Sequence, residues 1–312
     1  MSNYHVPVML SECLEALQLR TGAVYVDATL GGAGHSLAML QACPGIKLYS
    51  FDQDMDAIRH SSEVLQSFSD QVELIQANFS ALRTELALRR VAGINGILFD
   101  LGLSSHQIDM VERGFSFDRD ATLDMRMDQE QEYSALEAVN QLEVGELARI
   151  IRSYSDELHA LRIAKAIVSA RQETEIRTTR NLAAIIESVV GAGTKDSLKS
   201  KVRVFQAIRI HVNQELDVLE QALVDAIHLL VPGGRIVVMS YHSLEDRIVK
   251  NIFRDAAQGC KCPPKMIQCN CDEKQRIKLI TRKPVEASVN EVTNNNRARS
   301  AKLRVAEKIW GK

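Results

Sequence analysis

The sequence has no long uncharged apolar segment, which excludes an ordinary membrane-spanning helix. Its first ten residues lack a basic segment followed by an apolar one, so we expect no signal peptide and a cytoplasmic protein. Cysteine is scarce, with 6 residues in 312, which favours reduced thiols or a metal site over a disulfide framework. The net charge is only −2, so any nucleic-acid surface has to be a local basic patch.

The composition is that of a soluble globular protein. Hydrophobic residues make up 46% of the chain and charged residues 25%, which argues against membrane and disordered classes. The 312 residues are enough for one large domain and a smaller one.

A glycine-rich turn stands out near the start of the chain. The alternating run Val24 to Asp27 predicts a strand, Gly31, Gly32 and Gly34 predict a tight turn, and the residues from Ser36 predict a helix. Glycines at a helix N-terminus give freedom in φ and let a ligand approach the backbone amides. The alternative is an ordinary turn between strand and helix, because the spacing is not G-x-G-x-x-G.

Polar residues follow the next predicted strands in the same way. Asp52 closes the strand Lys47 to Phe51, in the position where dinucleotide-binding folds hold ribose hydroxyls. Phe79 follows the strand Val72 to Gln76, where it could stack on an adenine or belong to the core. Asp100 ends a fourth strand. Repeated strand and helix units of this kind predict a parallel sheet with its ligand crevice at these strand ends.

The pattern of the remaining chain predicts a helical insertion, followed by further strands and helices of the sheet. Residues 109 to 133 resemble an ordered loop, and residues 134 to 191 have the spacing of amphipathic helices. The basic stretch from Lys195 to Arg209 is either a solvated helix face or a phosphate-binding surface. After a helix to Leu230, Pro232 to Gly234 predict a stop before a strand starting at Arg235, and residues 290 to 299 predict a polar, basic loop. Near the N-terminus, Ser11 is the expected cap of a short helix.

These motifs together resemble the RsmH (MraW) family of ribosomal small-subunit RNA cytosine-N4 methyltransferases. The resemblance runs through nearly the whole chain, and its blocks occur in the family's order. They are His5-Val6-Pro7-Val8, Asp27 to His35, Phe51-Asp52, Phe99 to Gly102, Arg113 to Phe117, Leu123 to Asp128, Phe205 to Arg209, Pro232 to Arg235, Ser243 to Arg247 and Arg297 to Ser300.

The resemblance implies a fold and a division of the chain. It implies an α/β protein with a Rossmann-like class I methyltransferase sheet, interrupted after the fourth strand by an all-helical domain. The expected boundaries are 1–108 for the first part of the methyltransferase domain, 109–214 for the helical insertion and 215–312 for the second part.

The resemblance also implies S-adenosylmethionine as cofactor and a cytidine in the decoding region of 16S ribosomal RNA as substrate. By motif position, the cofactor contacts fall on Ala33, Gly34, His35, Asp52, Phe79, Asp100 and Gln107. For His35 the alternative is a capping or packing role. The partner is small-subunit RNA or the assembled subunit, and the patterns leave open whether the protein is a homodimer.

Asp100 is the candidate catalytic residue. The lone pair of the target amine is delocalised into the cytosine ring, so an acceptor is needed that draws the amine toward tetrahedral geometry. Either Asp100 or the backbone carbonyls beside it, with Ser104 or Ser105, would do this, or Asp100 is purely a cofactor ligand. Methylation at carbon would need a cysteine nucleophile in a Pro-Cys or Thr-Cys context, and neither dipeptide occurs in the chain.

Two further sets of residues are candidates for RNA and metal binding. Arg113, Arg126, His242, Arg297 and Arg299 are candidate RNA contacts, each with a structural salt bridge or a solvated surface as the alternative. Four cysteines lie within twelve residues, which suits tetrahedral zinc although the one-residue spacers are unusual, and the alternative is four reduced surface thiols. These cysteines are Cys260, Cys262, Cys269 and Cys271.

Two other functions are compatible with such a sheet. One is a nicotinamide-dependent oxidoreductase, which the glycine spacing and the lack of an obvious Tyr-x-x-x-Lys pair disfavour. The other is a non-catalytic RNA-binding assembly factor that retains the fold. Cofactor binding distinguishes the first from a methyltransferase, and labelled methyl transfer distinguishes the second.

Overall fold

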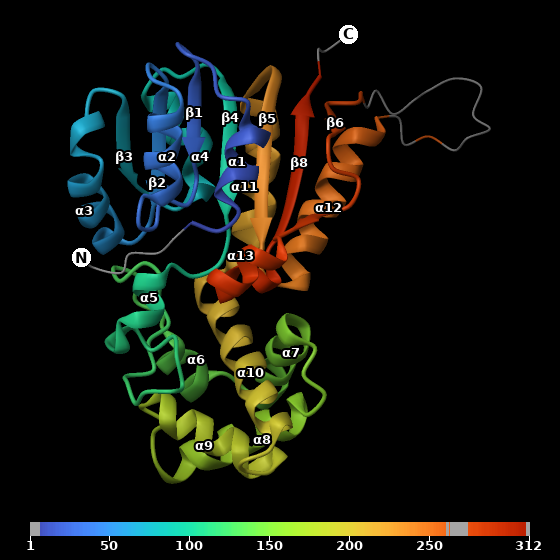
Figure 1. The fold of residues 1–312 in the computed structure, drawn as a ribbon. Helices are drawn as coiled ribbons and strands as arrows, with labels where there is room; N and C mark the ends of the chain where they lie inside the picture. The colour runs from blue at the N-terminus through green and yellow to red at the C-terminus, as the bar shows by residue number, and fades with distance from the viewer. Residues whose placement is uncertain (1–6, 260–261, 263–273, 310–312) are drawn as a thin grey trace. The chain divides into compact units, whose positions relative to one another are not determined.

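A computed structural model describes residues 7–259, residue 262 and residues 274–309. The chain forms two compact units, one made of Met1–Gly102 with Leu216–Lys312 and the other of Leu103–Glu215 (Figure 1). Among the residues that it describes, no helix is both long and apolar enough to cross a membrane.

The first unit is built on one mixed sheet. Its strand order is β3-β2-β1-β4-β5-β8-β6, with β7 paired to β8. The five strands from β3 to β5 are parallel, and β8 runs antiparallel to β5, β6 and β7. The strands are β1 (Val24–Asp27), β2 (Lys47–Asp52), β3 (Val72–Gln76), β4 (Ile94–Asp100), β5 (Leu230–Ser240), β6 (Ile277–Leu279), β7 (Val285–Glu286) and β8 (Lys302–Lys308).

Helices cover both faces of this sheet, which is why its central strands are nearly continuous apolar runs. They are α1 (Leu10–Leu17), α2 (Gly34–Ala42), α3 (Met55–Val64), α4 (Leu82–Leu88), α11 (Glu215–Leu229), α12 (Ser243–Gln258) and α13 (Val289–Asn294), with 3-10 helices at Gln66–Phe68, Phe79–Ala81 and Asn296–Ser300.

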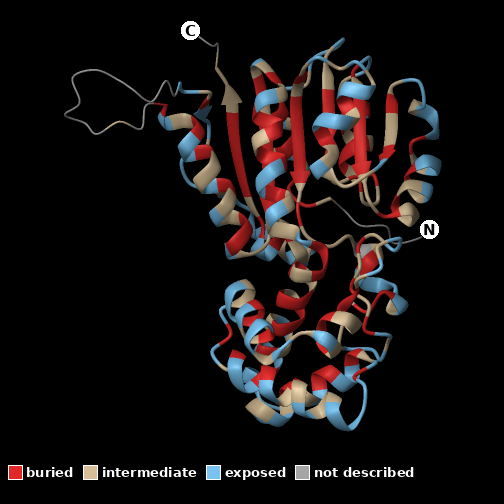
Figure 2. Ribbon diagram, turned by 180° about the vertical axis from the view of Figure 1, so that it is seen from behind, coloured by how far each residue is buried: buried red, intermediate tan, exposed pale blue. Residues whose placement is uncertain are grey.

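Successive strand residues supply two separate cores. Val26 and Phe99 lie in one core with α4, α11 and α12, whereas Tyr25 and Leu98 lie in the other with α1 and α2. Neighbouring residues of a strand point to opposite faces, so the two cores lie on opposite sides of the sheet. Figure 2 shows the strands buried and the helices exposed on their outer sides.

The topology places the candidate site at the carboxyl ends of β1 and β4. β1 pairs with both β2 and β4, so the chain builds one half of the sheet outward from β1 and the other half outward from β4. Ligands of open α/β sheets bind at this reversal of strand order. The α/β, Rossmann-like class expected from the sequence is confirmed.

The second unit, Leu103–Glu215, lies between β4 and α11 in the sequence and is helical. Its core joins Leu123 and Met125 of the long loop to the apolar faces of the helices. Among its described residues, strand pairing is limited to an isolated bridge between Thr122 and Thr178. The helices are α5 (Ser105–Asp109), a 3-10 helix at Val111–Arg113, α6 (Ala135–Gln141), α7 (Val144–Ser155), α8 (Ala160–Glu173), α9 (Thr179–Val190) and α10 (Lys195–Asn213).

Three local predictions are wrong. Ser11 does not cap α1, because the helix begins at Leu10 after Met9, whose N–H donates to the Glu291 carboxylate. The expected loop at residues 290 to 299 is α13 followed by a 3-10 helix, since Ser288 and Asn295 each cap a short helix. Pro232 to Gly234 do not precede β5 but lie inside it, where a register shift against β4 accommodates them.

Candidate active site

Asp27 fastens the turn after β1 to the start of α2. Its carboxylate is fully buried and accepts hydrogen bonds from the Thr29 N–H at 3.1 Å and from the Ser36 hydroxyl at 2.7 Å. Ser36 is in turn 2.8 Å from the Ser50 hydroxyl on β2. Burial raises the pKa of Asp27, with these hydrogen bonds and His35 acting in the opposite direction. Asp27 therefore holds the turn from inside the protein.

The turn itself ends in a helix N-terminus without a side-chain cap. Gly31 has φ 49°, and Ala33, the residue before α2, also adopts the left-handed region with φ 66°. No side chain of the described residues caps α2, so its first N–H groups are suited to an anionic group of a ligand. Gly34 was expected to let a ligand approach the backbone. In the structure the glycine is required because a Cβ at position 34 would overlap the ring of Pro7.

Asp52 closes β2 beside this turn. Its Oδ2 accepts the Gly31 N–H at 2.9 Å and its Oδ1 accepts the Asp54 N–H at 2.9 Å. Burial raises the pKa of Asp52 to about 6, while the two backbone hydrogen bonds lower it. A carboxylate in this state gains stability from further hydroxyl donors, which is the property required of a ribose-binding acid.

Phe79 packs in the core beside the same sheet edge. It begins the 3-10 helix Phe79–Ala81, and its ring meets that of Phe99 edge to face at 5.7 Å. The ring is only partly buried. Next to it, Asn78 Nδ2 donates a hydrogen bond to Gln53 Oε1 at 2.7 Å. The packing role is therefore present in the structure, and stacking on an adenine stays a prediction.

Asp100 is the most connected carboxylate of the site. Its Oδ1 accepts the Tyr241 hydroxyl at 2.6 Å, its Oδ2 lies 3.6 Å from His35 Nδ1, and its N–H donates to Thr29 Oγ1 at 2.7 Å. The side chain is 24% exposed, whereas that of His35 is 7% exposed. Burial raises the pKa of Asp100, against the opposing effects of His35 and of the Tyr241 hydrogen bond.

His35 connects Asp100 to the start of the chain. Its Nε2 lies 3.2 Å from the Val8 carbonyl oxygen, which can only accept, so Nε2 carries a hydrogen. Nδ1 then faces the carboxylate of Asp100. His35 thus has a packing role beside the candidate catalytic acid. A cofactor contact of His35 stays a prediction.

Tyr241 is the residue of this site that the sequence did not single out. It directly follows β5, whose Met239 is paired with Asp100 of β4. The available signal was its position directly after a strand that ends at the same sheet edge as Asp52 and Asp100.

Gln107 belongs to the second unit, where it caps α5. Its Oε1 accepts the Ser104 N–H at 3.1 Å, and its own N–H donates to Ser104 Oγ at 3.2 Å. This reciprocal capping box occupies Ser104 as well, which was a candidate helper of Asp100. A cofactor contact of Gln107 stays a prediction.

Comparison with known proteins gives the chain its family. The model of the MraW methylase family matches residues 2–309. The chain belongs to this family. Three full-length relatives carry the name ribosomal RNA small subunit methyltransferase H: one from Citrifermentans bemidjiense (50% identity, 98% of this chain and 99% of the relative), one from Finegoldia magna (48%, 98% of each) and one from Brevibacillus brevis (46%, 99% of each).

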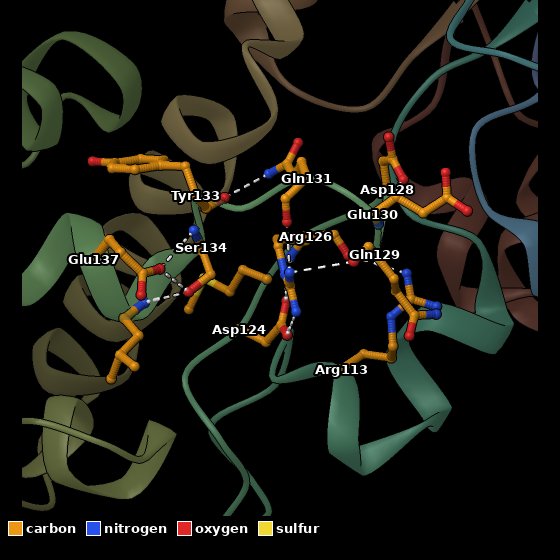
Figure 3. Close-up of polar contacts among 12 residues, drawn as sticks. Arg113, Asp124, Arg126, Asp128, Gln129, Glu130, Gln131, Tyr133, Ser134 and Glu137 are labelled. Atoms are coloured by element: carbon orange, nitrogen blue, oxygen red, sulfur yellow. Dashed lines mark hydrogen bonds and ion pairs between the residues drawn. The ribbon is translucent and has the colours of Figure 1, made fainter.

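Two arginines hold the long loop of the second unit together. Arg113 is 6% exposed, and its Nη2 donates to the carbonyl oxygens of Arg126 and Met127 at 3.1 and 3.0 Å. Arg126 forms a two-pronged ion pair with Asp124 and donates to the carbonyls of Gln129 and Gln131 (Figure 3). In this member of the methylase family both arginines thus have structural partners, and an RNA contact of either one stays a prediction.

The remaining candidate RNA contacts differ in how they are held. His242 is paired with Glu245 at 3.1 Å and caps α12. Arg297 is partly buried and Arg299 is exposed, both in the 3-10 helix Asn296–Ser300. Arg299 is thus the one of these three whose surroundings leave it most open to solvent. RNA contacts of these residues stay predictions.

The cysteine quartet falls almost wholly outside the described residues. Cys260, Cys269 and Cys271 lie outside them, and Cys262 is described as half-buried. The zinc hypothesis for this family member therefore stays a prediction from the sequence.

Proposed function

We propose that this MraW-family protein transfers a methyl group from S-adenosylmethionine to the exocyclic N4 amine of a cytidine in the decoding region of small-subunit ribosomal RNA. The observation that carries the proposal is the full-length match to the methylase family and to relatives named ribosomal RNA small subunit methyltransferase H. The arrangement of Asp52 and Asp100 around an uncapped helix N-terminus is consistent with it.

The residues at the strand ends fit the parts of this cofactor. Ala33, Gly34 and His35 surround the uncapped start of α2, which suits the carboxylate of the methionine moiety. Asp52 would accept the ribose hydroxyls, Phe79 would face the adenine, and Asp100 would complete the site at these strand ends. The bound cofactor would supply an electrophilic methyl group on a sulfonium.

Asp100 would act on the amine. A carboxylate oxygen that accepts a hydrogen bond from the amino group concentrates the nitrogen lone pair away from the ring and toward the methyl group. The part-exposed carboxylate of Asp100, with Oδ1 already occupied by Tyr241, leaves Oδ2 as the acceptor for that task. Transfer directly to nitrogen needs no covalent intermediate with the enzyme, and the proton that the methylated nitrogen loses would pass to Asp100 Oδ2 and from there to solvent.

Labelled methyl transfer tests the proposal. Purified protein is incubated with S-adenosylmethionine carrying a labelled methyl group and with small ribosomal subunits, or their naked RNA, from a strain that lacks the protein. We expect label in RNA, at N4 of a cytidine by mass spectrometry of nucleosides. Cofactor binding without any labelling of either substrate would contradict the enzymatic claim and favour the assembly factor.

Cofactor affinity is expected to depend on pH through Asp52. Its pKa is about 6 in the free protein, and hydroxyl donors of a bound ribose favour the charged form. Below pH 6 the acid must lose a proton for binding, so the dissociation constant should rise toward about tenfold for each further pH unit. Calorimetric titration with S-adenosylhomocysteine between about pH 5 and about pH 7.5 measures this, because that range lies on both sides of the pKa of Asp52.

Two variants separate Asp52 from other groups in that titration. Asp52→Asn should bind more weakly and lose the pH dependence. Asp56→Asn changes a partly exposed acid of the neighbouring helix, whose side chain is 37% exposed, and should retain the pH dependence. Equal pH dependence in Asp52→Asn and wild type would show that Asp52 does not contact the cofactor.

A metal measurement decides the role of the cysteine quartet. Four thiolates provide the ligand number of structural zinc, so we expect about one zinc per chain in protein purified under reducing conditions. Elemental analysis of the full chain and of Cys269→Ser with Cys271→Ser gives the answer. Protein that is folded and active without zinc would leave the cysteines as reduced thiols.

A further inference from the structure

A partly buried phenol lies over the end of β4. Tyr241 follows the last residue of β5, Ser240, and its hydroxyl donates to Asp100 Oδ1 at 2.6 Å. Its N–H donates to Glu245 Oε2 at 2.8 Å, so the first turn of α12 holds its backbone. Gly102, with φ 100°, passes close beneath the ring, since a Cβ there would lie 3.3 Å from the ring carbon Cδ2.

These contacts give the two carboxylate oxygens of Asp100 different environments. Oδ1 is held by the phenol, while Oδ2 faces the imidazole of His35 at 3.6 Å, longer than a hydrogen bond. The backbone of Asp100 is fixed as well, because its N–H donates to Thr29. Rotation of the carboxylate would break the bond to Tyr241, so the phenol decides which oxygen remains for another donor.

We propose that Tyr241 is a positioning residue for methyl transfer, which fixes the carboxylate of Asp100 so that Oδ2 stays available to the amine of the substrate. The inference rests on the proposed function. Tyr241 does not need to touch the substrate, because it acts through Asp100. A carboxylate held in one orientation by packed neighbours accelerates a reaction more than one that is free to rotate.

The charged and titratable groups around Asp100 make pH a suitable readout. They come from every element packed there: Cys13 on α1, Asp27 on β1, His35 on α2, Tyr241 directly after β5, and Glu245 in the first turn of α12. Burial raises the pKa of Asp100, and the hydrogen bond from Tyr241 lowers it. Burial and the neighbouring Asp100 hold the pKa of the Tyr241 phenol well above its usual value, so the phenol remains a donor.

Tyr241→Phe tests the proposal because it removes the donor and keeps the ring. We expect kcat near neutral pH to fall about tenfold and the acid limb of the kcat profile to move up by about one pH unit, since Asp100 loses a charge-assisted hydrogen bond. The dissociation constant of S-adenosylhomocysteine should stay within about twofold. Measurements use the full chain with small ribosomal subunits.

Tyr25→Phe is the matched control. This phenol is 1% exposed in the same unit, donates to the Gln18 carbonyl and accepts the Arg20 N–H, with no bond to Asp100. The Tyr25→Phe variant should lose thermal stability and keep the wild-type pH profile of kcat. If both variants keep that profile, or both lose activity without a change in it, Tyr241 has only a structural role.

Difluorotyrosine at position 241 provides a second test that preserves packing. Fluorine makes the phenol a stronger donor, so the acid limb should move to lower pH, opposite to Tyr241→Phe. An unchanged or upward shift overturns the inference. Inactive wild-type protein would instead count against the proposed function, because every comparison here is made relative to wild-type turnover.

Discussion

Asp100→Asn is expected to lower kcat for methyl transfer by at least about 100-fold, the loss typical of removing one group that stabilises a developing charge. Asparagine keeps the shape of the side chain, and its oxygen can still accept the Tyr241 hydroxyl. Its amide nitrogen then occupies the place of Oδ2, which turns an acceptor for the amine into a donor. Single-turnover rates with saturating cofactor and small subunits measure the effect.

The same variant distinguishes a catalytic role of Asp100 from a purely cofactor-binding one. If Asp100 acts on the amine, the dissociation constant of S-adenosylmethionine should change by less than about threefold. Asp52→Asn should show the opposite pattern, with weaker cofactor binding and near-normal turnover at saturation. A large loss of affinity in Asp100→Asn, with turnover restored by excess cofactor, would assign Asp100 to the cofactor alone.

The strand ends of the site could be predicted because their signals are local. An apolar run that ends in an acidic residue marks both a strand and the point where it ends, and this pattern placed Asp52 and Asp100 at the ends of β2 and β4. The reversal of strand order then brings β1 and β4 side by side. No long-range information was needed for these residues.

Other parts of the site depend on contacts between distant residues. Tyr241 and Asp100 are 141 positions apart, and only the register of β5 on β4 brings them together. The structural partners of Arg113 could not be predicted, because they are backbone carbonyls, which leave no mark in the sequence. The loop expected at residues 290 to 299 failed for a related reason, since two short helices there rest on single capping residues.

The loop of the second unit also depends on one glycine. Gly114 has φ 69° and directly follows Arg113, whose carbonyl accepts the Met125 N–H at 3.0 Å. A Cβ at 114 would overlap the Thr122 carbonyl oxygen and lie 2.9 Å from the Asp124 N. Both are backbone atoms, so neither can swing away as a flexible side chain could.

Gly114→Ala is therefore expected to destabilise the second unit by roughly 3 kcal/mol, the sum of a left-handed alanine and a backbone overlap. Hydrogen exchange of the amides of residues 113–128 and thermal unfolding measure it. Gly193→Ala is the control, because Gly193 has φ 72° in the same unit but open space around a Cβ. It should cost only about 1 kcal/mol. Equal losses of stability would mean that the left-handed backbone conformation alone excludes other residues at position 114. A larger loss in Gly114→Ala would show that the close packing of residues 122–124 on Gly114 also requires glycine there.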